Sequence, residues 1–375
     1  MKKKDDHYSY EEEFHGKERK QYKKERKILS KTDRSKYKKT DVDKRKKRES
    51  HKKEEEGAVK RGRVLGIAAE GIIVSSDHQF FTCTLRGSLK KETTQLKNLI
   101  AVGDFVQFLE QPHFTGLIVK IEERHSILSR AHHHTRHKEQ LIAVNIDQVL
   151  ITTSVVHPFL KPHLIDRYII AAKKGNMQPV IVINKIDFLE RPPPHIDPHL
   201  VEEEKNRLQE LIKIYRELHI PIFPVSTETQ EGIEALKKQM HGKSSVFSGQ
   251  SGVGKTSLIN LTAGAQLPVG AVQKTGKGKH TTTTTHLVPI EGEGFCIDTP
   301  GIGSFGLWDL KPEEIKHYFS EIAQYASQCR YPDCSHLIEP ECAVKTAVEK
   351  GKISPLRFAS YCALMESLTM EHRPR

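Results

Sequence analysis

Long hydrophobic runs are missing from this sequence. No stretch of 18 apolar residues occurs, so we expect no transmembrane helix and no membrane partner. The N-terminus also lacks the apolar core of a secretory signal, which leads us to expect a cytoplasmic protein. Only 36% of the residues are hydrophobic, and the deficit is concentrated at the N-terminal end of the chain.

That N-terminal end is strongly basic. Residues 1–56 hold 22 Lys/Arg against 14 Asp/Glu and so carry most of the formal net charge of +12. They show almost no apolar periodicity, so the segment cannot bury enough surface to offset its ordering entropy. We therefore expect residues 1–57 to form a basic, disordered arm. It is either an electrostatic tether to nucleic acid or a solvated tail that aids solubility.

Cysteine is also scarce, with six residues in a chain of 375. In a reducing compartment these residues are not expected to form a disulfide framework. Three of them instead cluster around a histidine in the order C-x4-C-x-H-x5-C, and three thiolates with one imidazole suit a tetrahedral, structural Zn²⁺. The alternative is a group of buried free cysteines. The expected ligands of one zinc ion per chain are Cys329, Cys334, His336 and Cys342.

Two different hydrophobic patterns follow the arm. Residues 58–127 read as short alternating runs punctuated by Gly, Asp and Pro, which predicts a small antiparallel β-barrel of about five strands, commonly an OB-fold. From about residue 140, apolar strands alternate with amphipathic helices, which predicts a parallel α/β sheet covered by helices. The predicted division is the arm at 1–57, the barrel at 58–128, the α/β domain at 129–308 and a zinc-binding helical domain at 309–375.

A phosphate-binding motif lies between an apolar run and a helix. Residues 249–256 read GQSGVGKT and fit G-x-x-x-x-G-K-[ST]. Glycines in such a loop let backbone N–H groups turn inward around phosphates, and the helix N-terminus favours the anion. Lys255 should reach the β- and γ-phosphates, and the Thr256 hydroxyl should bind Mg²⁺. The alternative is a glycine-rich turn without a ligand.

The base is predicted by "NKID" at 184–187, after another apolar strand. Asp187 can accept two hydrogen bonds from the N1–H and amino groups of guanine, a donor pair that adenine lacks. Asn184 can bond the acceptor edge of the base or buttress the phosphate loop, and the Lys185 stem can lie along the ring. The "VST" segment at 225–227 should offer a backbone N–H to the guanine oxygen.

A third motif, "DTPG" at 298–301, follows a strand about 40 residues after the phosphate loop. Asp298 can hold Mg²⁺ through water, and the Gly301 N–H can face the γ-phosphate. The expected GTP-binding residues are therefore Asn184, Lys185, Ile186, Asp187, Ser226, Gly249, Gln250, Ser251, Gly252, Val253, Gly254, Lys255, Thr256, Ser257, Asp298 and Gly301.

The order of these motifs is unusual, because most GTP-binding chains place the phosphate loop before the base loop. A parallel sheet fixes where loops lie in space and not the order in which the chain visits them. Joining the old termini and cutting the chain elsewhere preserves the site, so the order predicts a circularly permuted GTPase. The segment after "DTPG" then leads directly into the C-terminal region.

The segment 274–286, "KTGKGKHTTTTTH", is polar and glycine-rich, as expected for a switch loop ordered by γ-phosphate and Mg²⁺. A threonine from 281–283 should complete the Mg²⁺ shell, with Thr282 as the first choice. Many GTPases place a water-orienting Gln after the glycine of D-x-x-G, but Ile302 stands there. His280 is the nearest polar candidate for catalysis, and the alternative is an exposed loop histidine.

Taken together, these features resemble the ribosome small-subunit-dependent GTPase A family, RsgA or YjeQ. The likeness covers about residues 58–370. It includes, in this order, the barrel, "NIDQ" at 145–148, "NKID", "GQSGVGKTS", "KHTTT", "DTPG" with "FGLW" after it, and the cysteine cluster. "GIGSFGLW" departs from the family's usual "GVREFGLW", so the contacts of those charged positions are not carried over to this chain. The arm is longer than expected for the family, so its role is not carried over either.

The resemblance implies a circularly permuted α/β P-loop GTPase domain with an N-terminal OB-fold barrel and a C-terminal helical zinc-binding domain. It implies GTP hydrolysis, with Mg²⁺, during late maturation of the 30S subunit, stimulation by that subunit, and contact with 16S rRNA. It also assigns the hydrophobic replacement of Gln to Ile302 and the proposed catalytic histidine to His280. We expect a monomer that binds GTP and GDP. Two other functions stay open, a non-enzymatic RNA-binding protein that uses nucleotide for structure and an ATPase.

Overall fold

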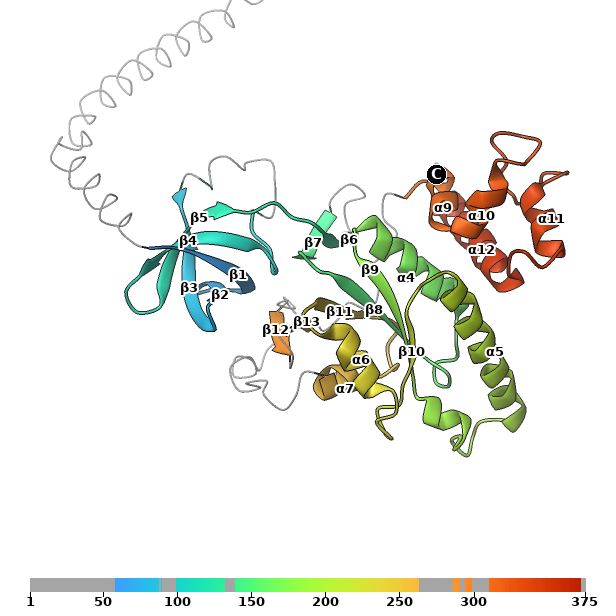
Figure 1. The fold of residues 1–375 in the computed structure, drawn as a ribbon, viewed down its shortest axis with the longest axis horizontal. Coiled ribbons are helices and arrows are strands. Elements are labelled where there is room, and N and C mark those ends of the chain that lie inside the picture. The colour runs from blue at the N-terminus through green and yellow to red at the C-terminus, as the bar shows by residue number, and fades with distance from the viewer. Residues whose placement is uncertain are drawn as a thin grey trace, which may run out of the picture. The chain divides into compact units, whose positions relative to one another are not determined.

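The computed structural model describes residues 58–87, 89, 99–131, 139–262, 286–290, 294–298 and 310–371. Apart from Ala58, they belong to one compact unit, Val59–Arg375. This unit contains a barrel, a sheet covered by helices and a group of C-terminal helices (Figure 1). The predicted basic arm lies outside the described residues. Among the described helices, none combines the length and the apolar character needed to span a bilayer.

Five strands form a closed barrel, as the alternating sequence pattern predicted. Their order is β1-β2-β3-β5-β4, and β4 pairs back with β1. Only β3 and β5 run parallel to each other, which gives an OB-like barrel. Alternate side chains point inward, and Val64, Val74 and Phe108 are fully buried there. The strands are β1 (Val59–Ala68), β2 (Gly71–Ser76), β3 (Gln79–Leu85), β4 (Phe105–Gln111) and β5 (Thr115–Ile121).

Beyond the barrel the same sheet continues in the order β10-β9-β8-β11-β13-β12, because β12 pairs with β1 at His286 and Gly66. The strands of this part are parallel except β12, which runs antiparallel to β13. Every residue of β8 is buried, as expected for a strand covered on both faces. The strands are β8 (Gln148–Ser154), β9 (Gln178–Asn184), β10 (Ile222–Pro224), β11 (Ser244–Ser248), β12 (His286–Ile290) and β13 (Gly294–Asp298).

Helices cover both faces of this sheet (Figure 1). Ile151 and Ile181 share a hydrophobic cluster with residues of α4 (Pro162–Lys174) and α5 (Pro198–Glu217). Their neighbours Leu150 and Val180 join another cluster with α6 (Ile233–Met240) and α7 (Lys255–Thr262). Because successive strand residues point to opposite faces, the two pairs of helices lie on opposite sides. A 3₁₀ helix, η2 (Ile186–Leu189), follows β9.

The C-terminal helices pack against α4 through a buried polar network. Arg357 pairs with Asp166 of α4, and its Nε donates to Glu321 Oε1 at 2.6 Å. The Tyr215 hydroxyl of α5 donates to Asp166 Oδ1 at 2.7 Å, and the Phe319 ring lies 4.2 Å below the guanidinium carbon. This network ties the C-terminal region to the α/β sheet. The helices are α9 (Pro312–Tyr318), α10 (Ser320–Ala326), α11 (Ala343–Glu349) and α12 (Pro355–Glu371).

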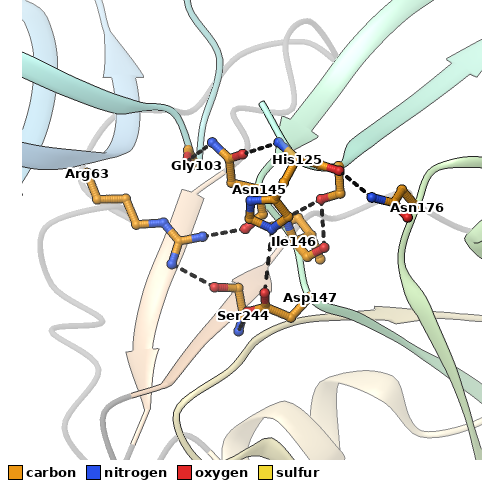
Figure 2. A network of polar contacts seen from close by, with 9 residues as sticks. Arg63, Gly103, His125, Asn145, Ile146, Asp147, Asn176 and Ser244 are labelled. Carbon is orange, nitrogen blue, oxygen red and sulfur yellow. Dashed lines mark hydrogen bonds and ion pairs between the residues drawn. The ribbon is translucent and has the colours of Figure 1, made fainter. Parts of the chain in front are cut away.

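A second polar network joins the barrel to the sheet (Figure 2). Arg63 of β1 donates to Asn145 O and to Ser244 Oγ, both at 2.6 Å. Its guanidinium lies between the rings of Phe105 and Phe295, at 5.0 Å and 4.9 Å from their centroids. Burial lowers the pKa of Arg63 to about 10, so the group stays charged near neutral pH. The barrel is thereby fastened to the first residue of β11, the strand that leads to the phosphate loop.

Two features differ from the sequence expectation. The antiparallel β12 departs from an all-parallel sheet, because only the three residues 291–293 separate it from β13, too few for a crossover helix. A two-stranded sheet of β6 (Ile127–Ala131) and β7 (Glu139–Val144) also stands outside both predicted sheets. Strand β6 spans the position 128 at which the barrel was expected to end.

Candidate nucleotide site and metal centre

The phosphate loop, residues 249–256, begins at the end of β11 and enters α7 at Lys255. Gly249 and Gly254 have φ values of 155° and 94°, in a region that disfavours side chains. A Cβ at Gly249 would lie 2.0 Å from Thr152 O, and one at Gly254 would lie 2.3 Å from Asn184 Nδ2. The loop therefore packs directly against the carboxyl ends of β8 and β9, where ligands of α/β sheets bind.

Lys255 lies across this loop. Its Nζ donates to Gly249 O at 2.8 Å and to Gln250 O at 2.6 Å, and burial lowers its pKa. Thr256 and Ser257 are exposed on the first turn of α7. An ammonium group and two hydroxyl groups thus surround the amino end of a helix, the arrangement that suits a phosphate chain and its cation.

Asn184 connects the phosphate loop to the base loop, residues 184–187. It is fully buried, its Nδ2 donates to Val253 O at 2.9 Å, and its Oδ1 accepts from Thr227 N at 3.2 Å. Two roles were considered for this side chain, a bond to the base and support of the phosphate loop. In the structure it supports the phosphate loop. Three segments distant in sequence therefore meet at one amide group.

Ser226 orients the carboxylate of Asp187. Its Oγ donates to Asp187 Oδ1 at 2.6 Å and accepts from the backbone N–H groups of Glu228 and Thr229 at 3.2 Å and 3.1 Å. Because Oγ accepts twice, its own hydrogen is directed to Asp187. The sequence analysis did not predict that the Ser226 hydroxyl would orient Asp187. The signal in the sequence was a serine shortly after β10, the strand that follows the base loop.

The backbone N–H groups of residues 225–227, one of which was expected to reach the guanine oxygen, have partners within the protein. Val225 N donates to Ile183 O at 2.8 Å, Ser226 N to Glu231 O at 3.0 Å, and Thr227 N to Asn184. The hydrogen bonds that close the turn consume all three donors. Asp187, beside this turn, is half-buried.

Lys185 also has a structural role in addition to its place in the base loop. Its backbone has a φ of 64°, and its Nζ donates to His157 O at 2.6 Å. Ile186 N donates to Val225 O at 3.3 Å, which holds the base loop beside the turn that carries Ser226. The base loop is therefore fixed on both sides by the loops that follow β8 and β10.

Several predicted residues lie outside the part of the chain that the structure describes. They are His280, Thr282, Gly301, Ile302 and the side chain of Asp298. The backbone of Asp298 ends β13, which pairs in parallel with β11, so its carboxyl end lies at the same sheet edge as the phosphate loop.

The four predicted metal ligands lie together in the C-terminal region. Their ligand atoms are all within 4.8 Å of one another. His336 Nδ1 is 3.5 Å from Cys329 Sγ and 3.4 Å from Cys342 Sγ, and these two sulfurs are 3.8 Å apart. Zn–S bonds of about 2.3 Å at tetrahedral angles place sulfurs about 3.8 Å apart, so Cys329, Cys334, His336 and Cys342 fit zinc.

Burial favours the uncharged forms of Cys334 and His336. It raises the pKa of Cys334 to about 12 and lowers that of His336, so in the absence of a positive charge the thiol keeps its proton and the imidazole is neutral. A bound Zn²⁺ would displace the thiol protons, since thiolate is the ligand form. All four side chains would be occupied by the ion, which gives a structural site without an open position.

Comparison with known proteins agrees with this geometry. A family model described as RsgA GTPase matches residues 121–308. "Small ribosomal subunit biogenesis GTPase RsgA 2" of Bacteroides thetaiotaomicron is 36% identical, over 78% of this chain and 92% of that protein. "Small ribosomal subunit biogenesis GTPase RsgA" of Chlorobaculum parvum is 40% identical, over 72% of this chain and 86% of that protein.

Solved structures extend the likeness to the fold. The crystal structure of YjeQ from Thermotoga maritima superposes with a TM-score of 0.67 at 32% identity, covering 84% of this chain and 100% of that one. The crystal structure of YloQ, a circularly permuted GTPase, gives a TM-score of 0.64 at 25% identity, with 85% and 97% covered. The order of motifs, the barrel and the joined loops have one explanation: the chain belongs to the RsgA GTPase family and is a circularly permuted, GTP-hydrolysing enzyme.

Proposed function

We propose that this enzyme is an assembly factor of the small ribosomal subunit that acts late in 30S maturation. In this proposal it binds the 30S subunit and its 16S rRNA in the GTP state, and the subunit stimulates hydrolysis. The names of the relatives support the choice of subunit. The basic arm supports an RNA partner, because Lys and Arg attract phosphates through counterion release.

The observation that carries the enzymatic part is Asn184, whose amide joins the phosphate loop to the base loop. A guanine held by Asp187 then has its phosphates within the cradle of residues 249–257, with Lys255 on the β- and γ-phosphates. Mg²⁺ would be held by the hydroxyls of Thr256 and Thr282 and, through water, by Asp298. The Gly301 N–H would face the γ-phosphate.

Hydrolysis in this proposal depends on the subunit because the site lacks a glutamine. Ile302 has no group that orients water, so His280 takes that role when the switch loop is ordered by 30S contact. The unstimulated rate should therefore be low. Release after hydrolysis follows from loss of the γ-phosphate contacts that order the loop.

The remaining parts have supporting roles. The barrel at 58–128 and the helical domain at 309–375 are proposed to contact the subunit, and the GTPase domain at 129–308 couples them. The cysteine cluster would hold one structural Zn²⁺. We propose that the protein works as a cytoplasmic monomer, with the arm at 1–57 as a tether.

The test is GTP turnover by the purified protein with and without 30S subunits, with 50S subunits as the matched control. The proposal expects stimulation by 30S only, lost when His280 is replaced by alanine. Equal rates in all three reactions would contradict it.

A further inference from the structure

Strand β1 is shared between the barrel and the α/β sheet. From Val59 to Arg63 it pairs with β4, which closes the barrel, and at Gly66 the same edge pairs with β12. Its opposite edge pairs with β2. The barrel is therefore joined to the α/β sheet by backbone pairing at Gly66, in addition to the Arg63 contacts that Figure 2 shows.

A bulge in β1 marks the change of partner. The register with β2 shifts between Val64 and Gly66, so Leu65 is one residue more than β2 has at this point. Val64 packs in the core of the barrel, whereas Leu65 belongs to the hydrophobic cluster of the α/β sheet, together with Leu287 of β12. Bulges bend a strand and redirect its side chains, which brings β1 to the edge of β12.

The pairing at Gly66 is part of a line of residues that leads to the nucleotide site. Gly66 pairs with His286, and His286 pairs on its other side with Asp298. His286 ends the segment 274–286, which contains the expected Mg²⁺ ligand Thr282, and Asp298 begins "DTPG". Three neighbouring strands therefore connect the barrel to both segments that are expected to reach Mg²⁺ and the γ-phosphate.

The His286 ring occupies the space that a side chain at position 66 would need. A Cβ on Gly66 would lie 2.7 Å from His286 Nδ1 and 3.3 Å from its Cε1. Gly66 is buried, and β12 begins at His286. Because packed atoms leave little free volume, contact of the ring with the bare backbone of Gly66 sets the distance between β1 and the start of β12.

The glycine is matched to His286 rather than to the barrel. The three atoms nearest to a Cβ on Gly66 all belong to His286. At Gly62, by comparison, the nearest atoms belong to Val74, Ser75 and Phe108 of the barrel. A side chain at position 66 would therefore press on β12, whereas one at position 62 would press on the barrel itself.

We propose that His286 is a positioning residue for the Mg²⁺–GTP state. Its ring, which rests on Gly66, sets the place of the neighbouring strand end from which Asp298 reaches the metal. This assignment rests on the proposed role of Asp298 in holding Mg²⁺. It makes β1 a support of the GTPase site, so a partner that shifts the barrel would act on the same three strands.

The test measures the Mg²⁺ concentration at half-maximal binding of a fluorescent, non-hydrolysable GTP analogue to the full-length protein. Gly66→Ala should raise this concentration about tenfold, which corresponds to one lost hydrogen bond to a charged group. In a His286→Ala background the same change should alter it less than about twofold, because the ring that the new Cβ would strike is absent. Gly87→Ala is the matched control, since a Cβ at Gly87 meets no atom within 4 Å. Binding of GDP without Mg²⁺ should not change in any variant.

Two results with Gly66→Ala would overturn the proposal. A Mg²⁺ requirement within twofold of that of the unmodified protein would mean that the ring gives way without moving β12. An equal rise in both backgrounds would assign the effect to the barrel. Where Gly66→Ala melts too early for titration, His286→Ala decides: it should raise the requirement more than about twofold while His286→Phe, which keeps a flat ring, does not, and an unchanged requirement in His286→Ala would overturn the proposal.

A second measurement separates this inference from the assembly function. With 30S subunits, Gly66→Ala should lower the stimulated kcat and leave the KM for the subunit unchanged. Absence of 30S stimulation in the unmodified protein would reject the assembly function, and the Mg²⁺ titration would still decide the role of His286.

Discussion

Replacing Asn184 with alanine breaks the two hydrogen bonds that join the base loop to the phosphate loop. The change leaves Val253 O, on a buried residue, without its donor and Thr227 N–H without its acceptor. No charge is altered, and both hydrogen bonds that the amide makes in this structure are to the protein. The variant therefore isolates the connection between the two loops.

The magnitude follows from these two groups. A buried polar group without a partner costs about 1–3 kcal/mol. Thr227 is only half-buried and can reach water, so we expect about 2–4 kcal/mol in total. Without nucleotide the loops can move apart and recover part of this cost, but the bound state needs both in place. If the cost falls mainly on binding, the dissociation constants for GTP and GDP rise roughly 30- to 1000-fold.

Isothermal titration calorimetry with GDP and a non-hydrolysable GTP analogue measures this loss. Asn206→Ala is the matched control, since Asn206 is exposed on α5 and takes no part in the site. Unchanged affinity for both nucleotides in Asn184→Ala would refute the reasoning that this amide holds the two loops on one ligand.

Three further predictions concern the base, the metal and the buried ion pair. In a competition assay, Asp187→Asn should lower the affinity for GTP at least tenfold and raise the affinity for xanthosine triphosphate, because O2 of xanthine accepts a hydrogen bond from the new amide. An unchanged preference between the two nucleotides would count against base reading by this residue. Cys334→Ser should lower both the zinc content measured by elemental analysis and the melting temperature, and a full zinc equivalent in the variant would exclude the cluster as the site. Arg357→Met should destabilise folding by about 3–5 kcal/mol because Asp166 is left buried and unpaired. Burial already raises the pKa of Asp166 above its unfolded value, and loss of the Arg357 guanidinium raises it further. The destabilisation, measured by urea titration, should therefore grow as the pH rises and Asp166 loses its proton. A loss of stability that does not depend on pH would contradict the ion-pair explanation.

Much of the fold was visible in local sequence. Alternation in residues 58–127 predicted the barrel, and apolar strands followed by amphipathic helices predicted the covered sheet, because these patterns reflect which side chains are buried. One of these helices is α4, which ends at Lys174 with Gly175 as its cap. The spacing of the cysteine cluster likewise predicted side chains that lie together.

The unpredicted features depend on partners far away in the chain. Arg63 and Arg357 look like surface residues in sequence, and only the folded chain shows the rings and acceptors that bury them. The backbone donors of residues 225–227 looked available because a sequence does not reveal that Glu231 O and Asn184 Oδ1 reach back to them. The role of Asn184 stayed open for the same reason, since its acceptor Val253 O is 69 residues away.

The central claim is that loops in permuted order hold one guanine nucleotide. A crystal structure of the protein with Mg²⁺ and a non-hydrolysable GTP analogue tests it most directly. We predict a single nucleotide whose guanine N1–H and amino group donate to Asp187 and whose β- and γ-phosphates contact Lys255 Nζ. A nucleotide that touches one of these residues while its other end lies away from the second would contradict the account.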